Sequence, residues 1–426
     1  MANAFITPLE ITREFLDILH SNIVIAKNMD RRYEHLFGNA GVALAGKIGP
    51  TLNIRKPNQV TIRSGWTMQQ QDITEQYVPL TVDTPFGVDL QFDDASLALT
   101  IDDFSERYIE PAAKRMAAEL DMRAGLFILN NTFSQVGEYD GTTDTTTPSK
   151  AATFTAAHAL IKKNLAPVGL DEVSAIISPD TEASIVPGLS GLYNPQNVIS
   201  KQFMSGEMIR ALGLNFEMSQ VLSAHTNGTR TDSTPVTSTF TSLPALGTSS
   251  LTITGGGTLT YKAGDLLTIA GVYNINPETK QQYNSLKQFV VTADTTSVNS
   301  GFSLPIAPAI YTSGPLQNCY ATTAASKAIV NSGIGATGGA AGSGVASYTY
   351  ANDLVLHKRA FALATVPLEL PRGLDMAERA SSDGISVRFL RGYDMINARQ
   401  LSRMDIFYGM AALRPEWSVR VRGLHA

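Results

Sequence analysis

The chain has 426 residues, of which 17% are charged and 43% hydrophobic, and its formal net charge is −5 at pH 7. This length is sufficient for two or three domains with a substantial buried core. The negative net charge argues against a general nucleic-acid-binding protein, because the neutralisation of phosphates requires a basic surface. The low charged fraction leaves much apolar and Thr/Ser surface to cover, which suits a protein that contacts many copies of itself. The single cysteine, Cys319, excludes an internal disulfide framework and is consistent with folding in a reducing cytoplasm.

The N-terminal segment predicts an amphipathic helix that begins at Pro8, with Thr7 as N-cap and Glu10 completing a capping box. One side of this helix is apolar and comprises Leu9, Ile11, Phe15, Ile18, Leu19 and Ile23. Another side carries an acidic stripe of Glu10, Glu14 and Asp17. Like charges at this spacing cost a few tenths of a kcal/mol per pair, so a basic partner is one explanation of the stripe. The alternative is an ordinary solvated face.

Residues 51–65 alternate between apolar and polar side chains around 56–59, which predicts a β-hairpin with its turn at these four residues. The apolar residues are too few to bury this hairpin against its own domain. Arg55, Lys56 and Arg63 make it basic. We therefore expect the hairpin to project and to contact another surface through these three residues.

Residues 77–92 alternate again and predict strands, and a long helix is expected over residues 100–131. Its large apolar residues recur mostly at spacings of three and four, and they are Ile101, Phe104, Tyr108, Met116, Leu120 and Phe127. Pro111 predicts a kink or a restart of the helix. At 1.5 Å per residue the whole element would be about 45 Å long, which is about the width of a domain. We interpret it as a structural spine, and the alternative is an ordinary core helix.

The chain after residue 150 changes its sequence pattern twice. Residues 154–220 alternate helix and strand signals, which predicts a mixed α/β region. From residue 223 to 325 the chain becomes rich in Thr, Ser and Gly with short apolar alternations, which predicts a small barrel or sandwich. Because mixed α/β sequence is expected to resume at about 348, this region is interpreted as an insertion whose ends lie close together. Strands are predicted at 385–390, 404–413 and 417–422.

Residue patterns for catalysis or metal binding are weak. Gly333, Gly335 and Gly338 have the spacing of a dinucleotide-binding loop, but no apolar strand precedes them, so we interpret them as a linker. The six histidines show no metal-ligand spacing, and Cys319 has no basic neighbours that would favour its thiolate. We therefore expect no catalytic residue, no cofactor, no metal and no enzymatic activity. With no signal peptide and no long apolar run, no membrane-spanning segment is expected either.

Six segments, taken together and in order, resemble the major capsid (coat) proteins of tailed bacteriophages, in particular the coat of short-tailed Salmonella phages, which carries an inserted domain. The segments are NIRKPNQVTIRSG (53–65), DDFSERYIEPAAKRMAAELD (102–121), IRALGLNFEMSQ (209–220), YKAGDLLTIAGVYNINPETK (261–280), AFALATVPLEL (360–370) and RMDIFYGMAALRPE (403–416). The resemblance covers nearly the whole chain.

This resemblance implies an α+β chain with the Hong Kong 97-type capsid fold, which has axial and peripheral domains, a spine helix, an extended hairpin loop and an N-terminal arm, here with an inserted β-barrel. The implied parts are the arm at 1–28, a connection at 29–47, the extended loop at 48–70, the peripheral domain with the spine at 71–150, the axial domain at 151–222 and 346–399, the inserted barrel at 223–345 and the C-terminal peripheral strands at 400–426.

The implied function is assembly, in the host bacterial cytoplasm, of hexamers and pentamers into the icosahedral shell of a virion around double-stranded DNA. The implied partners are other copies of the chain, a separate scaffolding protein, a portal protein and packaged DNA through non-specific contact with the inner surface. Whether a decoration protein binds is left open. Glu10, Glu14 and Asp17 are the scaffold-binding candidates, because their acidic stripe suits a basic scaffolding segment. The alternatives are a phage tail or adhesin subunit and a cellular encapsulating shell of the same fold.

Overall fold

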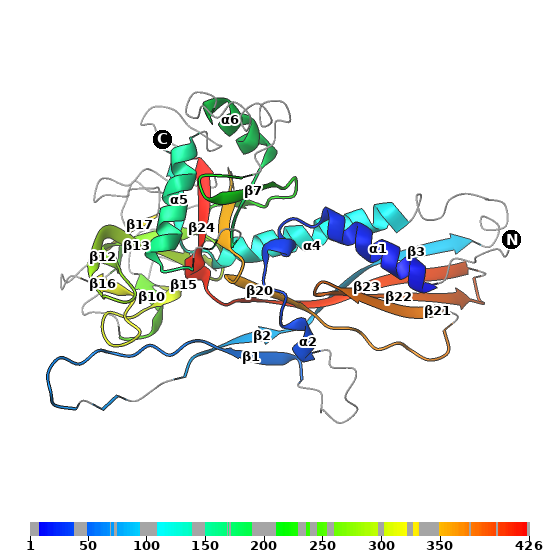
Figure 1. The fold of residues 1–426 in the computed structure, drawn as a ribbon, viewed down its shortest axis with the longest axis horizontal. Helices are drawn as coiled ribbons and strands as arrows, with labels where there is room; N and C mark the ends of the chain where they lie inside the picture. The colour runs from blue at the N-terminus through cyan, green and yellow to red at the C-terminus, as the bar shows by residue number, and fades with distance from the viewer. Residues whose placement is uncertain are drawn as a thin grey trace. The chain divides into compact units, whose positions relative to one another are not determined.

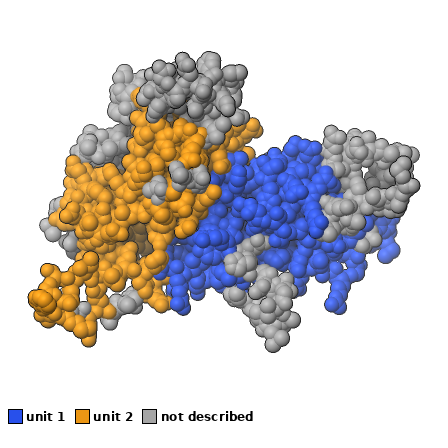
Figure 2. All heavy atoms as spheres, in the orientation of Figure 1, with its two compact units in different colours: residues 1–56, 77–124, 361–413 blue, residues 57–76, 125–360, 414–426 orange. Residues whose placement is uncertain are grey.

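A computed structural model describes residues 8–37, 49–68, 70–71, 75–93, 109–138, 150–167, 169, 172–189, 210–228, 236–238, 245–253, 260–296, 302–321, 327–331, 349–374, 376–397 and 399–423. The chain forms two compact units (Figure 2). Unit 1 comprises residues 1–56, 77–124 and 361–413, and unit 2 comprises residues 57–76, 125–360 and 414–426. The helical elements are α1 (Pro8–Asn22), α2 (Glu34–Phe37), α4 (Glu110–Asn131), α5 (Ala151–Lys163), α6 (Pro179–Leu189) and the short 3-10 turns η1 (Ala26–Asn28) and η3 (Pro415–Trp417) (Figure 1).

Helix α4 is the described part of the predicted spine, since residues 100–108 lie outside the described residues. The helix begins at Glu110, where the sequence predicted a kink or restart. Pro111 lies in its first turn, where a missing backbone N–H costs no helical hydrogen bond. Of the predicted stripe, Met116 and Leu120 are buried and Phe127 is half-buried. Most of the remaining buried face consists of small residues, namely Ala112, Ala113, Ala117 and Ala124.

Unit 1 is built on a five-stranded antiparallel sheet in the order β20-β23-β22-β21, with β3 also paired to β23 (Figure 1). Its strands are β3 (Thr84–Asp93), β20 (Phe361–Thr365), β21 (Met376–Ser382), β22 (Ile385–Asp394) and β23 (Arg399–Ala412). These include the strands predicted at 385–390 and 404–413. Helix α1 packs against β21 and β22.

The hairpin turn predicted at residues 56–59 is wrong. Strand β1 (Thr51–Arg55) pairs instead with β2 (Tyr77–Thr81), with Arg55 opposite Tyr77, so a long loop of residues 56–76 joins them. The reason is apolar pairing. The register sets Leu52 against Leu80 and Ile54 against Val78, and these residues pack in a core with β20 and β23. The sequence analysis expected too few apolar residues to bury the hairpin against its own domain. For the paired strands β1 and β2 this expectation is wrong.

Strand β2 also lies directly over β23, at a glycine. A Cβ atom at Gly409 would lie 2.0 Å from the backbone oxygen of Thr81 and 2.8 Å from Cα of Val82. Only the absence of a side chain allows the two backbones to approach so closely.

Unit 2 contains a six-stranded mixed sheet in the order β4-β24-β19-β5-β7-β6. Its strands are β4 (Gln135–Glu138), β5 (Val173–Ile177), β6 (Arg210–Ala211), β7 (Leu214–Met218), β19 (Asp353–His357) and β24 (Ser418–Gly423), and α5 packs against β24 and β4. The last strand of the chain thus belongs to unit 2, whereas residues 361–413 belong to unit 1. These divisions differ from the expected boundary at 399–400, because strand pairing and not sequence proximity groups the segments.

The Thr/Ser-rich region forms a seven-stranded antiparallel sheet with the path β10-β15-β13-β12-β17-β9 and β16 paired to β12. Its strands are β9 (Val236–Ser238), β10 (Thr248–Ile253), β12 (Leu266–Ile275), β13 (Gln282–Val291), β15 (Phe302–Ile310), β16 (Cys319–Ala321) and β17 (Lys327–Asn331), and two short strands, β11 (Thr260–Tyr261) and β14 (Thr295–Thr296), pair with each other. The sheet has a core of its own around Phe289, Leu267 and Leu304. Closure into a barrel stays a prediction.

The two ends of this region lie side by side, as expected for an insertion. Strand β8 (Ala224–Thr226) pairs with β18 (Thr349–Ala351), with His225 opposite Tyr350. The described elements after β18 are strands and the turn η3, so the prediction that mixed α/β sequence resumes near 348 is wrong there. These strands complete sheets whose other members come from earlier in the chain.

We expect Gly409→Ala to lower the free energy of unfolding of the unassembled subunit by about 1–3 kcal/mol, because the new methyl group forces β2 away from β23. Urea denaturation would measure this. Gly392→Ala is the matched control, since a Cβ there meets only the flexible end of Leu374, at 3.3 Å. Equal stabilities for the two variants would contradict the close approach.

Candidate assembly surfaces

The apolar face of α1 is buried within the subunit. Phe15, Leu16, Leu19 and Ile23 are at most 4% exposed, and the sequence prediction had missed Leu16. Because α1 packs against β21 and β22, this face is already occupied in the isolated chain. Only the other side of the helix is left for a partner.

A buried carboxylate on α4 fastens the segment that follows α1. Asp121 is 2% exposed. Its Oδ2 accepts a hydrogen bond from the backbone N–H of Val24 at 2.7 Å, and its Oδ1 accepts one from the N–H of Ala26 at 2.9 Å. Because one side chain accepts both hydrogen bonds, Asp121 of the spine fixes the path of the arm at this point.

Three further contacts tie the arm to the sheet of unit 1. His20 Nε2 donates to the carbonyl of Ser382 at 2.9 Å, and Arg31 forms an ion pair of 2.8 Å with Asp383 in the turn between β21 and β22. The backbone of Asp30 bonds to both sides of Ala362 in β20, donating to Phe361 O at 2.8 Å and accepting from the N–H of Leu363 at 3.0 Å. The arm is therefore an integral part of unit 1.

The predicted scaffold-binding residues lie on this fixed helix. Glu14 and Asp17 are exposed. Glu10 belongs to α1, but its side chain is outside the described part of the chain. The structure thus presents two of the three acidic residues to solvent on one element whose orientation is set by the contacts above.

The loop between β1 and β2 has an internal hydrogen-bond framework. The side-chain amide of Gln71 accepts from the N–H of Thr61 at 2.8 Å and donates to its carbonyl, which mimics a strand pairing. Arg63 Nη1 donates to the carbonyl of Gly65, and also to that of Thr67 at 3.2 Å. The guanidinium of Arg63 thus holds the turn of its own loop.

This loop exposes large apolar side chains. Val60 is 63% exposed, Ile62 92%, Met68 75% and Trp66 101%. Of the basic residues predicted to make the contact, Arg55 and Arg63 are exposed and Lys56 is half-buried. Sequence reasoning missed the apolar set. The sequence feature that could have indicated this apolar set is Trp66, one of only two tryptophans in the chain, which lies in a polar stretch next to a glycine.

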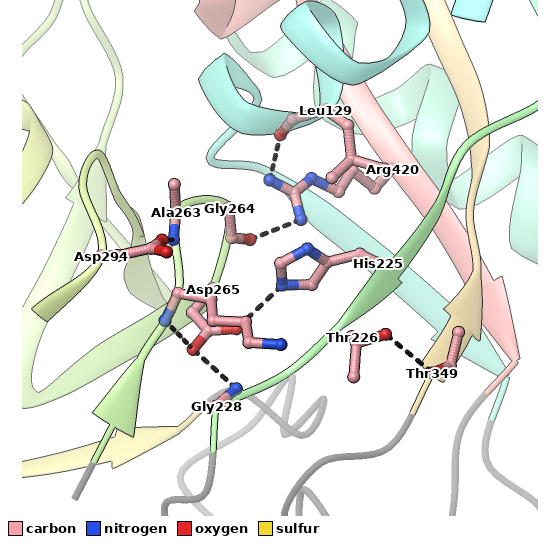
Figure 3. A network of polar contacts seen from close by, with 11 residues as sticks. Leu129, His225, Thr226, Gly228, Ala263, Gly264, Asp265, Asp294, Thr349 and Arg420 are labelled. Carbon is pink, nitrogen blue, oxygen red and sulfur yellow. Dashed lines mark hydrogen bonds and ion pairs between the residues drawn. The ribbon is translucent and has the colours of Figure 1, made fainter. Parts of the chain in front are cut away.

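A buried polar network joins the ends of the inserted region to the rest of unit 2 (Figure 3). Asp265 is 0% exposed, and its carboxylate accepts from His225 Nε2 at 2.8 Å, from the N–H of Gly228 at 3.2 Å and from the N–H of Lys262 at 3.0 Å. One carboxylate therefore connects the strand that enters the insertion to the loop before β12.

Arg420 extends this network from β24. Its guanidinium donates to the carbonyl of Gly264 at 2.8 Å and to that of Leu129 in the last turns of α4 (Figure 3). Burial lowers the pKa of Arg420 to about 9. The side chain of Arg420 on β24 thus contacts both helix α4 and the loop before β12 of the inserted sheet.

The inserted sheet has a second attachment at β13. The side chain of Gln288 accepts from the N–H of Gln135 at 2.7 Å and donates to its carbonyl at 3.1 Å. The ammonium of Lys287 lies 5.0 Å from the ring centre of Phe133, and burial lowers the pKa of Lys287 to about 8. The contacts of the insertion thus include specific polar ones, beside the apolar packing of Leu266 and Val290 against Phe133.

Two further titratable groups in the interior, Cys319 and Asp353, have structural partners. Burial raises the pKa of the Cys319 thiol to about 11, so it is a poor nucleophile. Burial raises the pKa of Asp353 to about 7, while its Oδ1 accepts from the N–H of Ser178 at 2.8 Å, just before α6.

Within the described ranges, no cluster of His, Cys, Asp and Glu could hold a metal ion. None of the helices that the structure describes is long and apolar enough to cross a membrane.

Comparison with known protein families gives a match over nearly the whole chain. The family described as P22 coat protein, gene protein 5, matches residues 6–423. No curated protein matches the chain.

Among solved structures, one of Mycobacterium phage Che8 aligns with 11% identity, covering 94% of this chain and 90% of that one, at a TM-score of 0.47. The mature capsid of bacteriophage PhiM1 aligns with 13% identity over 94% and 87%, at 0.43. The capsid of a native GTA particle aligns with 8% identity over 88% and 86%, at 0.40.

We expect Asp121→Ala to lower the free energy of unfolding by about 2–4 kcal/mol and to make the arm sensitive to protease, because two backbone donors lose their acceptor. Urea denaturation and limited proteolysis of the unassembled subunit would measure both effects. Glu119→Ala, which removes a partly exposed i,i+4 pair with Arg123, is the control and should cost less than about 1 kcal/mol. Similar losses in the two variants would contradict a special role of Asp121.

Proposed function

Because the chain belongs to the P22 coat protein family, it is a major capsid protein of the Hong Kong 97-type fold that builds the icosahedral shell of a tailed phage, and we propose that a separate scaffolding protein directs this assembly by binding α1. The protein is a structural component of the virion and not an enzyme. Its family membership favours this function over a tail or adhesin subunit and over a cellular encapsulating shell.

The observation that supports a scaffold site is the orientation of α1. Its apolar face is buried against β21 and β22, and Glu14 and Asp17 are exposed on the other side. Since the helix is fastened through His20 and through the segment held by Asp121, a partner meets it without ordering it first. Such preorganisation reduces the entropic cost of binding. A basic segment of the scaffolding protein is the complementary partner.

We expect Glu14→Lys and Asp17→Lys to reduce the yield of scaffold-dependent shells, because each reverses a charge on the binding face. Electron microscopy and sedimentation velocity of the protein with and without scaffolding protein would measure the yield. Glu278→Lys makes the same charge change on an exposed turn of the inserted sheet and serves as control. If both arm variants assemble into shells of normal yield and shape, the scaffold site is elsewhere.

The loop of residues 56–76 is proposed to contact a neighbouring copy in the lattice. The fully exposed Trp66 supports this, because a tryptophan held in an ordered turn provides a large rigid contact area at small entropic cost. The basic residues Arg55 and Lys56 then play a secondary part, since exposed ion pairs are worth about 0–1 kcal/mol. Each contact is modest, but the shell repeats it many times.

We expect Trp66→Ala to lower the yield of closed shells at least tenfold while the subunit remains folded. The loss of a buried tryptophan contact costs about 2–4 kcal/mol per interface. Light scattering would follow assembly, and circular dichroism would verify the fold. Trp66→Phe should retain most of the yield, and Arg55→Ala should have a smaller effect than Trp66→Ala. Normal assembly of Trp66→Ala would rule out the loop as an anchor.

The proposal also includes a portal protein through which DNA enters the shell. With a net charge of −5 the chain is suited only to non-specific contact with packaged DNA. A decoration protein remains outside this proposal.

A further inference from the structure

A lysine and an asparagine side chain meet in the interior of the inserted region, between β12 and β13. Lys287 on β13 is 7% exposed, and Asn274 on β12 is 8% exposed. The side-chain nitrogen Nζ of Lys287 lies 3.3 Å from the side-chain oxygen Oδ1 of Asn274. A primary amine and a carboxamide, the two groups that combine in an isopeptide bond, are therefore held in contact inside one subunit. Such contact makes a reaction between them intramolecular.

The strand register places both side chains on one face of the sheet. Tyr273 lies opposite Leu286, and Asn274 and Lys287 each follow one member of this pair. Residues in these positions are diagonal neighbours, close enough for long side chains to meet. The register shifts on either side of the Tyr273 pair, and such bulges twist the strands locally and re-aim side chains. Cys319 lies opposite Asn274 and belongs to the buried core, so this face is the interior.

The charged form of Lys287 is poorly satisfied in this interior. An ammonium carries three N–H donors, and among the described residues Asn274 is its hydrogen-bond acceptor. The ring of Phe133, 5.0 Å from Nζ, adds only a cation–π contact. A buried charge with so few partners is costly, and burial lowers the pKa of Lys287 to about 8. At neutral pH a part of the molecules therefore carries the neutral amine, which is the nucleophilic form.

Two acidic groups face Lys287 from neighbouring elements. Against the dominant effect of burial, the charges of Cys319 on β16 and of Glu416 in η3 raise the pKa of Lys287. Burial raises the pKa of the Cys319 thiol to about 11, so this group stays protonated at neutral pH. Glu416 is partly exposed, and Arg414 Nη1 lies 3.9 Å from its Oε1. Glu416 is thus the carboxylate that is available to accept a proton and return it.

We propose that Lys287 and Asn274 form an isopeptide bond that joins β13 to β12 within one subunit. In this step the bond between Nζ of Lys287 and Cγ of Asn274 forms, the bond between Cγ and Nδ2 breaks, and ammonia leaves. The proton that the attacking amine loses passes through the carboxylate of Glu416 to the leaving nitrogen. An amine and an amide give an amide and ammonia, so no oxidant or further reagent takes part.

The product fits this interior better than the two separate side chains. The new amide is uncharged and has one N–H donor in place of the three of the ammonium, which removes the cost of a buried charge beside Phe133. The bond also closes a covalent loop through the turn between β12 and β13, and such loops restrict the unfolded chain. Since both partners belong to the insertion, the bond stabilises the inserted sheet without joining subunits.

Mass spectrometry of the full-length chain, recovered from purified shells and denatured, tests the bond. We expect an intact mass lower than the sequence mass by one ammonia. After digestion with trypsin we expect a branched peptide that joins the segment of Asn274 to the segment of Lys287. Glu416→Gln should slow the reaction, so that freshly folded protein retains the full sequence mass.

Two variants and a matched control locate the reaction. Lys287→Met keeps a long side chain without the charge, and Asn274→Ala removes the carboxamide, so both should have the full mass of their sequences while circular dichroism shows the native fold. Lys280→Met is the control, because Lys280 Nζ donates to the backbone carbonyls of Pro315 and Gln317 and meets no carboxamide. This variant should lose one ammonia as the natural chain does.

The full sequence mass in the natural chain, with trypsin cleaving after Lys287, would overturn the inference. A loss of ammonia that persists in Lys287→Met would overturn it as well, because the ammonia would then come from another site. Unchanged kinetics in Glu416→Gln would overturn the proton-transfer role of Glu416 alone. None of these outcomes depends on where the scaffolding protein or a neighbouring copy binds.

Discussion

Helix α4 carries the buried polar contacts on which the position of the other segments depends. Asp121 binds two backbone N–H groups of the arm, and the carbonyl of Leu129 accepts from the buried guanidinium of Arg420. A buried donor or acceptor without a partner costs about 1–3 kcal/mol, so each contact strongly favours one arrangement of the chain. Residues 110–124 of this helix belong to unit 1 and residues 125–131 to unit 2. The helix is a spine in this energetic sense, because it satisfies buried donors that come from segments far away along the chain.

The inserted sheet shows how a region with its own core is still bound to its host. Its interior around Phe289 and Leu267 is built from its own strands. Its attachment adds the hydrogen bonds of Asp265, Gln288 and Arg420, which require a defined geometry, to apolar packing against Phe133. Apolar burial is not directional, whereas such polar contacts specify one orientation. Hydrophobic burial thus makes the sheet stable, and the polar network decides where it sits.

The division between buried and exposed apolar surface connects the fold to shell assembly. The apolar face of α1 and the residues of β1 and β2 are covered within the subunit. The loop around Trp66 and the turn at Met395 and Ile396 are not, although both are held by internal hydrogen bonds. A capsid subunit must remain soluble before assembly and then bind many copies. Small, ordered and separate apolar sites meet both requirements, because none of them alone supports association.

Much of the fold could be predicted from the sequence. Periodicity and capping located α1, the C-terminal part of the spine and the last three strands, and short apolar alternations indicated the β-structure of the inserted region, because these signals are local to each element. The resemblance of six segments also indicated the family correctly. The acidic positions Glu14 and Asp17 followed from helical spacing alone, and the structure places both on the exposed side.

Only the tertiary structure decided which strands pair and which side chains remain free. Residues 59–64 alternate as well as 77–81 do, yet β1 selects the latter, because Leu80 and Val78 find a core with β20 and β23. Likewise Arg63, which the sequence suggested as an intersubunit contact, is exposed and also donates to carbonyls of its own loop, and the exposed Trp66 near it was not indicated by the sequence analysis. A sequence indicates which residues are apolar enough to be buried. Whether a given residue is buried depends on packing partners far away along the chain, and only the folded structure shows those partners.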